Sequence, residues 1–564
     1  MQVAYKRAEQ PSERRVYLKD VSEKQLSRVR GAGFSWNKQS KLWEGCPSVF
    51  MLEALSQMIR LPASLLALKT ELDASQQAIN AERVLDKTQV KQRISVPVNA
   101  QLFAHQIKGL NMALERFKEG AGFGLLFEVG CGKTLTAISI AGVLFEKNKI
   151  ERVLVVCPSS IVSVWEQDIE KFAAFPYTVR ALQGNKQTRL KLLEGLLNAT
   201  LGDPPLSIAV INYESVHREG IFQGLLGYDA DLIICDESQR IKTHNAAQSK
   251  AMHKLGDKAR YKLILSGTPV QNNAIDLWSQ YRFLDPSIFG SNFYAFKARY
   301  TVSGGFQGKQ IIGYQNLEEL IKKAHSIAYR VKKEECLDLP EQLFIDRPIE
   351  LSAPEKRLYN DIKNESLAEL ESGTVTAETI LTKILRLQQF TGGFLADDEG
   401  NMNQVSSAKL DTLKEILEDF IPSGDKVVIF ARFTEELKAI KKLLDNMSIK
   451  FDFIDGSVPQ EKRGGIVSHF QNDSETKVFL AQVATAGLGI TLTAASISIF
   501  YSVSFNYAEF TQCVGRIHRI GQKKKCTYIN LVCKDTIDEK ILKALSKKQL
   551  TAKEIVDDWR SYFE

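Results

Sequence analysis

The chain has 564 residues, a formal net charge of +7, 44% hydrophobic residues and 25% charged residues. This length predicts about four domain-sized units, and this composition is that of an ordinary soluble globular protein. No apolar run is long enough to cross a bilayer and residues 1–15 are too polar for a secretory signal, so we expect no membrane partner.

The first predicted unit is a small α+β module over residues 1–60, followed by a helical connector over 61–95. The module has eleven Lys and Arg against six Asp and Glu, a net +5, and this excess permits a polyanionic partner. Its segment RVRGAGFSWNKQSKLWE (28–44) interleaves basic and aromatic side chains, a pattern that can grip phosphates and stack on unpaired bases. The candidates for nucleic-acid contact are Arg28, Arg30, Trp36 and Lys38.

The same aromatic residues also have a structural interpretation. Phe34, Trp36 and Trp43 could form the core of the module, which has little else to bury. The two interpretations are compatible if one ring is buried and another is exposed.

Between residues 96 and 335, β-rich apolar runs alternate with helical stretches, which predicts a parallel α/β sheet. The runs are VLVVCP (153–158), SIAVINY (207–213), DLIICDE (231–237) and KLILSGTP (262–269). A Gly-rich hairpin is expected at 304–316, and a helical insertion at 336–410. A second sheet is expected within 411–545, and a helical tail over 546–564. The runs of the second sheet are KVVIFAR (426–432), KFDFID (450–455), KVFLAQ (477–482), ISIFYSV (497–503) and TYINLV (527–532).

The stretch LLFEVGCGKTLTAI (125–138) joins an apolar run to a helical pattern, which is the context of a phosphate-binding loop. Gly130 and Gly132 would let backbone N–H groups turn toward an anion at a helix N-terminus. Lys133 can then reach the β- and γ-phosphates of a nucleotide, and the Thr134 hydroxyl can bind Mg²⁺. The alternative is a Gly-rich turn with a surface lysine.

A second candidate site lies about a hundred residues later, where DLIICDESQ places Asp236 and Glu237 at the exit of an apolar strand. A nucleotide hydrolase needs one carboxylate to hold Mg²⁺ and another to orient the attacking water. Asp236 suits the first role and Glu237 the second. An adjacent Asp-Glu pair is otherwise a common solvated strand end, so its significance depends on the preceding loop.

Six segments occur in the order of helicase motifs I to VI: LLFEVGCGKT, CDESQRIK, LILSGTPVQNN, VVIFARF, ATAGLGITLT and QCVGRIHRIGQ. Over residues 100–545 the chain therefore resembles helicase superfamily two, and within it the Swi/Snf-type DNA-dependent ATPases. This resemblance implies two tandem RecA-like lobes with ATP and Mg²⁺ between them and double-stranded DNA across both.

The resemblance also implies roles for single residues. Gln106 resembles the glutamine that reads adenine, and Ser159 and Ser160 are candidates for phosphate contacts along the tracked strand, with helix capping as the alternative for both. The motif that couples hydrolysis to the DNA site comprises Ser266, Gly267 and Thr268.

In the last motif, Arg516 and Arg519 are three residues apart and share one face if the segment is helical. The resemblance implies that both are arginine fingers on the γ-phosphate, an interaction worth about 10³–10⁵ in rate. The alternative is a basic surface helix. In ATAGLGITLT, Thr485 is expected to contact DNA phosphates, and Gly487 and Gly489 to approach the ATP.

Three features depart from the family pattern or qualify it. Phe127 stands where the strict phosphate-loop pattern has glycine, and Gln239 closes the DExx box in place of histidine. Both are expected beside the triphosphate, where they would affect rate and nucleotide preference. Cys131 lies within the loop, so we expect the nucleotide site to be sensitive to thiol reagents. The eight cysteines form no C-x-x-C pair, which predicts a reducing compartment without structural disulfides.

The leading functional hypothesis is a monomeric ATP-driven translocase or remodeller of double-stranded DNA. A second is a remodeller that anneals forked or branched DNA, because GFSWNKQSKLW resembles the HARP-type modules of annealing helicases. A third, from another class, is a DNA-binding scaffold with a decayed ATPase, against which the intact motif residues argue. The compact chain resembles bacterial or phage-encoded members, so we expect a cytoplasmic, nucleoid-associated protein rather than a nuclear one.

Overall fold

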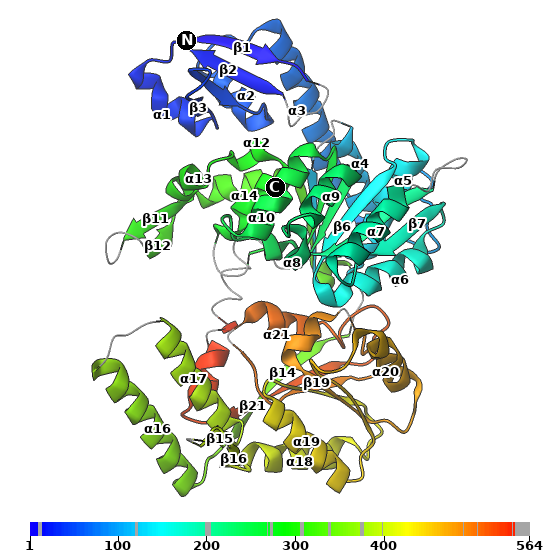
Figure 1. The fold of residues 1–564 in the computed structure, drawn as a ribbon, viewed down its shortest axis with the longest axis vertical. Coiled ribbons are helices and arrows are strands. Elements are labelled where there is room, and N and C mark those ends of the chain that lie inside the picture. The colour runs from blue at the N-terminus through cyan, green and yellow to red at the C-terminus, as the bar shows by residue number, and fades with distance from the viewer. Residues whose placement is uncertain are drawn as a thin grey trace. The chain divides into compact units, whose positions relative to one another are not determined.

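The computed structural model divides the chain into two compact units, the first up to Cys336 and the second beginning at residue 337 (Figure 1). The structure describes residues 1–8, 14–118, 122–197, 205–267, 269–270, 274–304, 310–336, 340–372, 377–397, 399–488, 490–504, 506–543 and 545–546. The predicted C-terminal tail lies outside this range except for Ser546. Each unit is described by itself below.

The first unit begins with an antiparallel sheet of order β1-β2-β4-β3. Its elements are β1 (Gln2–Lys6), β2 (Arg15–Lys19), α1 (Glu23–Gly31), β3 (Ser35–Asn37), β4 (Leu42–Gly45) and α2 (Val49–Ser56). The connector helix α3 (Ala63–Val84) inserts Leu65, Leu68 and Leu72 into the same hydrophobic core. The module and the connector therefore share one core.

The main part of the first unit is a parallel sheet of order β13-β5-β10-β9-β6-β8-β7. Its first half comprises α4 (Ala104–Phe117), β5 (Gly122–Phe127), α5 (Lys133–Glu146), β6 (Arg152–Cys157), α6 (Val162–Phe172), β7 (Tyr177–Ala181), α7 (Lys186–Leu197) and β8 (Leu206–Asn212). Its second half comprises α8 (Tyr213–Val216), α9 (Ile221–Tyr228), β9 (Leu232–Asp236), α10 (Ala247–Lys258) and β10 (Tyr261–Leu265). The buried apolar runs predicted from the sequence form β6, β8, β9 and β10.

The remainder of the first unit returns the chain to the sheet edge. It comprises α11 (Asp276–Leu284), α12 (Pro286–Phe289), α13 (Phe293–Tyr300), β11 (Thr301–Gly304), β12 (Gln310–Tyr314), α14 (Leu317–Ser326), β13 (Ala328–Val331) and α15 (Lys333–Cys336). β11 and β12 pair in antiparallel fashion and form the expected hairpin. β13 then pairs with β5, beside the predicted phosphate loop.

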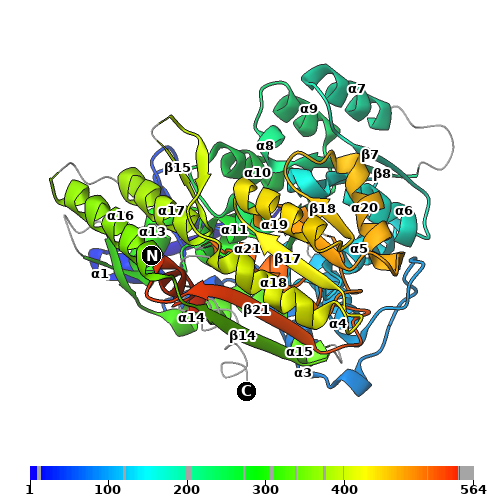
Figure 2. The ribbon, with the colours of Figure 1, turned by 90° about the horizontal axis from the view of Figure 1, so that it is seen from below.

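The second unit contains a parallel sheet of order β14-β21-β20-β17-β19-β18. Its elements are β14 (Gln342–Ile349), α16 (Ala353–Ser372), α17 (Ala377–Thr391), β15 (Phe394–Ala396), β16 (Met402–Gln404), α18 (Ala408–Phe420), β17 (Val427–Ala431), α19 (Thr434–Asn446), β18 (Phe451–Ile454), α20 (Gln460–Asn472), β19 (Val478–Gln482), β20 (Ile497–Phe500), α21 (Tyr507–Val514) and β21 (Cys526–Cys533). The segment expected as a helical insertion is not all helical, because β14 is an edge strand of this sheet (Figure 2). Its residues, QLFIDRPI, are mostly exposed and show neither a buried apolar run nor a regular alternation of apolar and polar positions.

The fold is thus α/β, with a small N-terminal α+β module and two parallel sheets flanked by helices. Within the described residues, no helix is both long enough and apolar enough to cross a membrane.

Candidate functional site

The predicted phosphate loop follows β5 directly and ends where α5 begins. Gly130 and Gly132 have φ angles of 94° and 77°, in the left-handed region that favours glycine. The Lys133 ammonium folds back over the loop and donates to the Phe127 carbonyl at 3.0 Å. The loop therefore surrounds the N-terminus of a 14-residue helix, which is a favourable position for an anion.

Two side chains of α4 hold this loop in place. The His105 ring lies with Nε2 at 2.9 Å from the Cys131 carbonyl, and Gln106 Nε2 donates to the Gly132 carbonyl at 3.2 Å. The positive φ of Gly132 strains any other residue there, and a Cβ atom would also lie 2.3 Å from Gln106 Nε2, so both the backbone and this contact favour glycine. Gln106 is 1% exposed, and its Oε1 accepts from the Phe103 N–H. Its amide is therefore engaged with the protein, and its role in reading adenine stays a prediction.

Phe127 has a structural role that the sequence did not show. Its ring is fully buried and meets the rings of His105 and Tyr329 edge-on, with centroid distances of 5.7 and 5.8 Å. Gly109 of α4 leaves room for it, since a Cβ there would lie 2.9 Å from Phe127 Cζ. The side chain therefore packs β5 against α4 and β13 in the core, while the Phe127 carbonyl faces Lys133 of the loop. A position beside the triphosphate stays a prediction for this backbone and is not supported for the ring.

Cys131 is also buried, with 0% exposure. Its Sγ lies 3.8 Å from Sγ of Cys336, which is brought there by α15 at the end of the unit. This burial argues against the sensitivity to thiol reagents expected from the sequence, and labelling of the folded protein tests it.

Asp236 and Glu237 lie at the carboxyl end of β9, at the same sheet edge as the loop. Trp165 Nε1 donates to Asp236 Oδ2 at 2.9 Å, and the Glu237 N–H donates to Oδ1 at 2.9 Å. Burial raises the pKa of Asp236 to about 7, and the Glu237 carboxylate adds to this effect while Lys133 opposes it. A desolvated carboxylate beside a second carboxylate is a position that a divalent cation would stabilise.

Glu237 is linked to the predicted coupling motif by two hydrogen bonds. Gln239 Nε2 donates to Glu237 Oε2 at 2.6 Å, and Ser266 Oγ donates to Gln239 Oε1 at 2.8 Å. Gly267 lies against the phosphate loop, because a Cβ there would be 3.3 Å from the Val129 N atom. Ser266 and Gly267 therefore connect the acidic pair to the loop, whereas Thr268 lies outside the described residues.

Sequence reasoning missed Arg330, which closes this network from β13. Its Nη1 donates to the carbonyls of Leu126 and Gly267 at 2.8 and 3.3 Å, and its Nη2 contacts Glu128 Oε1 at 3.2 Å. Arg330 lies about two hundred residues from the loop in the chain, so no local pattern could have indicated it.

The residues at this sheet edge fit a magnesium–nucleotide complex. The glycine-rich loop and Lys133 suit a polyphosphate, and Asp236 and Thr134 offer hard oxygen ligands. Thr134 lies in the first turn of α5, one residue from Lys133 and partly exposed. These residues would hold Mg²⁺ and phosphates together.

In the second unit, α21 ends at Val514, so Arg516 and Arg519 lie in the following turn and not on a helix. The two guanidinium groups nevertheless lie together, because both donate to the Ile490 carbonyl, at 3.5 and 3.1 Å. The segment is not helical, so the condition for a shared helix face is not met, but the two side chains still lie close together.

The predicted nucleic-acid residues lie in several elements, and not all of them are exposed. Thr485 is 6% exposed and its hydroxyl donates to the Gln482 carbonyl; Gly487 lies in the same 3₁₀ turn, Val483–Leu488, and Gly489 lies outside the described residues. Ser159 is exposed just after β6, and the side chain of Ser160 lies outside the description.

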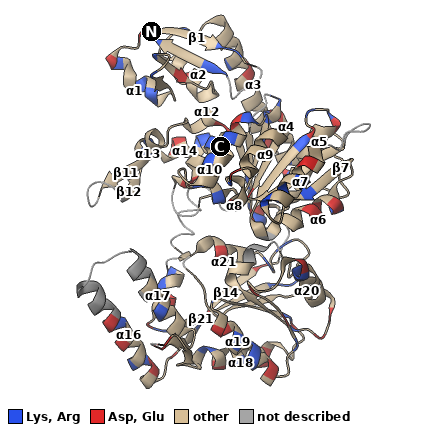
Figure 3. Cartoon of the chain, in the orientation of Figure 1, with Lys and Arg blue, Asp and Glu red and all other residues tan. Residues whose placement is uncertain are grey.

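The four residues of the module that we predicted to contact nucleic acid are all exposed, whereas the other two aromatic residues of that segment are buried. α1 carries Arg28 and Arg30, both exposed, and shows as a basic segment in Figure 3. Trp36 is 49% exposed, whereas Phe34 and Trp43 are buried in the module core. The Arg30 guanidinium lies 5.6 Å from the centre of the Trp43 ring, and Lys38 is exposed. One ring is thus available for stacking while two others hold the module together.

Comparison with known proteins places these features in a family. Residues 105–392 match the SNF2-related domain, and residues 408–521 match the helicase conserved C-terminal domain. The protein named "Uncharacterized ATP-dependent helicase MG018" of Mycoplasma genitalium is 30% identical over 437 residues, which cover 76% of this chain and 40% of that protein. The ISWI chromatin-remodeling complex ATPase ISW1 of Saccharomyces cerevisiae is 27% identical over 473 residues, which cover 80% and 40%.

Among solved structures, the Sulfolobus solfataricus SWI2/SNF2 ATPase core in complex with dsDNA has a TM-score of 0.40 and 27% identity, covering 84% of this chain and 97% of that one. This chain spans about 40% of the length of the curated relatives named above. The SNF2-related match alone covers more than half of the 564 residues. The chain therefore belongs to the SNF2-related family, whose members are ATP-dependent helicases.

Proposed function

We propose that the protein is an ATP-driven translocase that moves along double-stranded DNA. The observation that carries this proposal is that the phosphate loop with Lys133 and the acidic pair Asp236–Glu237 follow the carboxyl ends of strands in one parallel sheet, close enough for Lys133 to lower the pKa of Asp236. The names of the relatives, an ATP-dependent helicase and a chromatin-remodeling ATPase, support it.

In this proposal the residues of the first unit divide the work of hydrolysis. Lys133 and the loop N–H groups bind the β- and γ-phosphates, and Thr134 and Asp236 hold Mg²⁺, which neutralises charge on the phosphates. Glu237 orients and deprotonates the attacking water, and Gln239 holds the Glu237 carboxylate in position. Ser266, at the other end of this chain of hydrogen bonds, transmits the state of the site to the DNA-binding surface.

Arg516 and Arg519 of the second unit are proposed to stabilise the charge that develops on the γ-phosphate. Their convergence on the Ile490 carbonyl supports a joint role, since two guanidinium groups held together can act on one phosphoryl group. Contacts of Ser159 and Thr485 with DNA phosphates belong to the same proposal, and these make binding fall as salt rises.

The test is ATP hydrolysis with and without double-stranded DNA, in the wild type and in Lys133→Ala. Lys147→Ala is a matched control, because Lys147 caps the other end of α5 and is exposed. We expect DNA to stimulate hydrolysis, Lys133→Ala to abolish it and Lys147→Ala to leave it unchanged. Absence of DNA stimulation would contradict the translocase and favour a DNA-binding scaffold.

A second candidate is remodelling of forked or branched DNA, favoured by the exposed Trp36 on the basic face of the module. Here the module would bind an unpaired strand by stacking on Trp36, with phosphates contacted by Arg28, Arg30 and Lys38. The test compares stimulation of hydrolysis by forked and blunt duplexes in wild type and Trp36→Ala. If the variant keeps the preference for forks, the module does not recognise them.

A further inference from the structure

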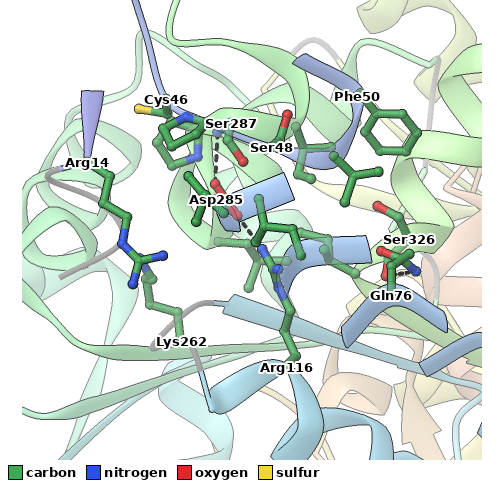
Figure 4. Close-up of a pocket in the computed structure, with 18 residues that line it drawn as sticks. Arg14, Cys46, Ser48, Phe50, Gln76, Arg116, Lys262, Asp285, Ser287 and Ser326 are labelled. Carbon is green, nitrogen blue, oxygen red and sulfur yellow. Dashed lines mark hydrogen bonds and ion pairs between the residues drawn. The ribbon is translucent and has the colours of Figure 1, made fainter. Parts of the chain in front are cut away.

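A small pocket lies between the N-terminal module and the amino ends of the strands of the first sheet, and the charges of its described lining residues are unbalanced (Figure 4). The charged side chains that line it are Arg14, Arg116, Lys262 and Asp285. Among the described residues that line the pocket, three cations face one carboxylate, a net charge of +2, in a space of about 710 Å³ that includes the open mouth.

Lys262 is the unusual member of this group. It is the second residue of β10, a strand with neighbours on both sides, and its side chain is only 4% exposed. No hydrogen bond or ion pair joins its ammonium group to another residue in the described part of the chain, and Figure 4 shows none to the residues drawn. Burying a cation without a partner is costly, so this position favours a bound anion.

The neighbouring carboxylate does not supply that anion. Asp285 Oδ2 accepts from Arg116 at 2.6 Å, and Asp285 Oδ1 accepts from the Ser287 N–H at 2.8 Å. The nearby Asp257 is likewise engaged, in a two-point ion pair with Arg282 at 2.7 and 2.9 Å. Burial accordingly lowers the pKa of the Lys262 ammonium despite the attraction of both carboxylates.

The pocket is separate from the nucleotide site. Lys262 lies at the amino end of β10, whereas the phosphate loop and Asp236 follow the carboxyl ends of β5 and β9. Since these strands are parallel, the pocket lies at their amino ends and the nucleotide site at their carboxyl ends, on opposite sides of the sheet along the strand direction.

One wall of the pocket continues into a larger groove. Cys46, Ser48, Phe50 and Ser287 line both, and the groove is also lined by Arg30, Trp36 and Lys38. A strand held along this groove would bring a phosphate to the mouth of the pocket.

We propose that this pocket binds a phosphate group, supplied either by free inorganic phosphate or by the terminal phosphate of a DNA strand. Arg116 and Arg14 provide guanidinium donors around the group, and Lys262 provides the buried counter-charge. Phosphate binding at this pocket does not depend on ATP hydrolysis, so it can be tested separately from the proposed function.

The experiment is titration of the full-length protein with inorganic phosphate at constant ionic strength. Calorimetry measures the affinity for phosphate, and the shift of the melting temperature with phosphate concentration is a second measure of binding. All proteins bear Lys133→Ala, which weakens phosphate binding at the nucleotide loop. The test variant is Lys262→Met, the charge-preserving variant is Lys262→Arg, and the control is Lys258→Met, at an exposed lysine near the end of α10.

We expect phosphate affinity to fall at least tenfold in Lys262→Met, to be largely kept in Lys262→Arg and to be unchanged in Lys258→Met. Without phosphate, Lys262→Met should melt no lower than its parent, because it removes an unpaired buried charge. Phosphate affinity equal in Lys262→Met and its parent would overturn the proposal.

Oligonucleotides distinguish the two sources of the phosphate group. The same single strand is titrated with a 5′-phosphate and with a 5′-hydroxyl end into both proteins. A preference for the phosphorylated end that disappears in Lys262→Met assigns the pocket to DNA ends. Equal binding of the two strands, together with Lys262-dependent binding of inorganic phosphate, assigns it to the free ion.

Discussion

The hydrogen bonds that join Ser266, Gln239 and Glu237 lead to a quantitative prediction for Gln239→Met. Methionine has a similar length but no polar atoms for these bonds, so Glu237 Oε2 loses its 2.6 Å bond from Gln239 Nε2. A hydrogen bond to a charged group is worth about 1.5–3 kcal/mol. If this energy positions Glu237 only in the transition state, kcat falls about 10- to 100-fold. KM for ATP stays within about twofold, because the loop keeps its contacts.

The assay is steady-state ATP hydrolysis at saturating double-stranded DNA. Gln248→Met is the control, because Gln248 Nε2 donates to the Arg240 carbonyl at 2.6 Å and has no bond to Glu237. Ser266→Ala completes a double-mutant cycle, in which a coupling between residues 239 and 266 should be measurable. In Gln239→Met the buried Ser266 hydroxyl loses its 2.8 Å hydrogen bond to Gln239 Oε1. Such a bond is worth about 0.5–1.5 kcal/mol of stability, so assays are run well below the melting temperature. A kcat within twofold of wild type, or an equal loss in Gln248→Met, would refute the reasoning.

Three further predictions concern other parts of the first unit. Burial lowers the pKa of His253 from 6.5 to about 4, so its neutral ring stabilises the fold above pH 6.5, and this contribution is lost as the pH falls toward 4. The free energy of unfolding, measured with denaturant, should therefore decrease less between pH 6.5 and 4 in His253→Gln than in the wild type. An equal decrease in both proteins contradicts this prediction. Trp36→Ala should weaken single-stranded DNA binding by about 1–3 kcal/mol at an unchanged melting temperature, whereas Trp43→Ala should lower the melting temperature. Fluorescence anisotropy measures the DNA binding, and calorimetry measures the melting temperature. Cys131 should stay unmodified by a maleimide in the folded protein and react after unfolding, as followed by mass spectrometry; modification at the rate of the unfolded chain would contradict its burial.

The interior of the two sheets was predictable because its signals are local. Each buried parallel strand is a short run of β-branched and apolar residues, such as VLVVC in β6 and LIICD in β9. The exposed edge strand β14 was missed for the same reason, since QLFIDRPI has neither a buried run nor a clean alternation. Its place in the sheet depends on pairing with β21, about 180 residues away.

The candidate nucleotide site shows the same division between local and distant determinants. Gly130, Gly132 and Lys133 can be recognised from the sequence, because a phosphate loop needs those residue types in one short segment between a strand and a helix. The residues that position the loop and the acidic pair come from other elements, namely His105, Trp165, Ser266 and Arg330.

The sequence by itself therefore determined the family, the buried strands in their order along the chain and the residues of the phosphate loop, because these depend on neighbours in the chain. Only the tertiary structure decided that Phe127 packs in the core, that Cys131 is buried and that Lys262 is a buried cation with no ion pair to any described residue. Burial and pairing are properties of a side chain's surroundings, and those surroundings are assembled from distant parts of the chain.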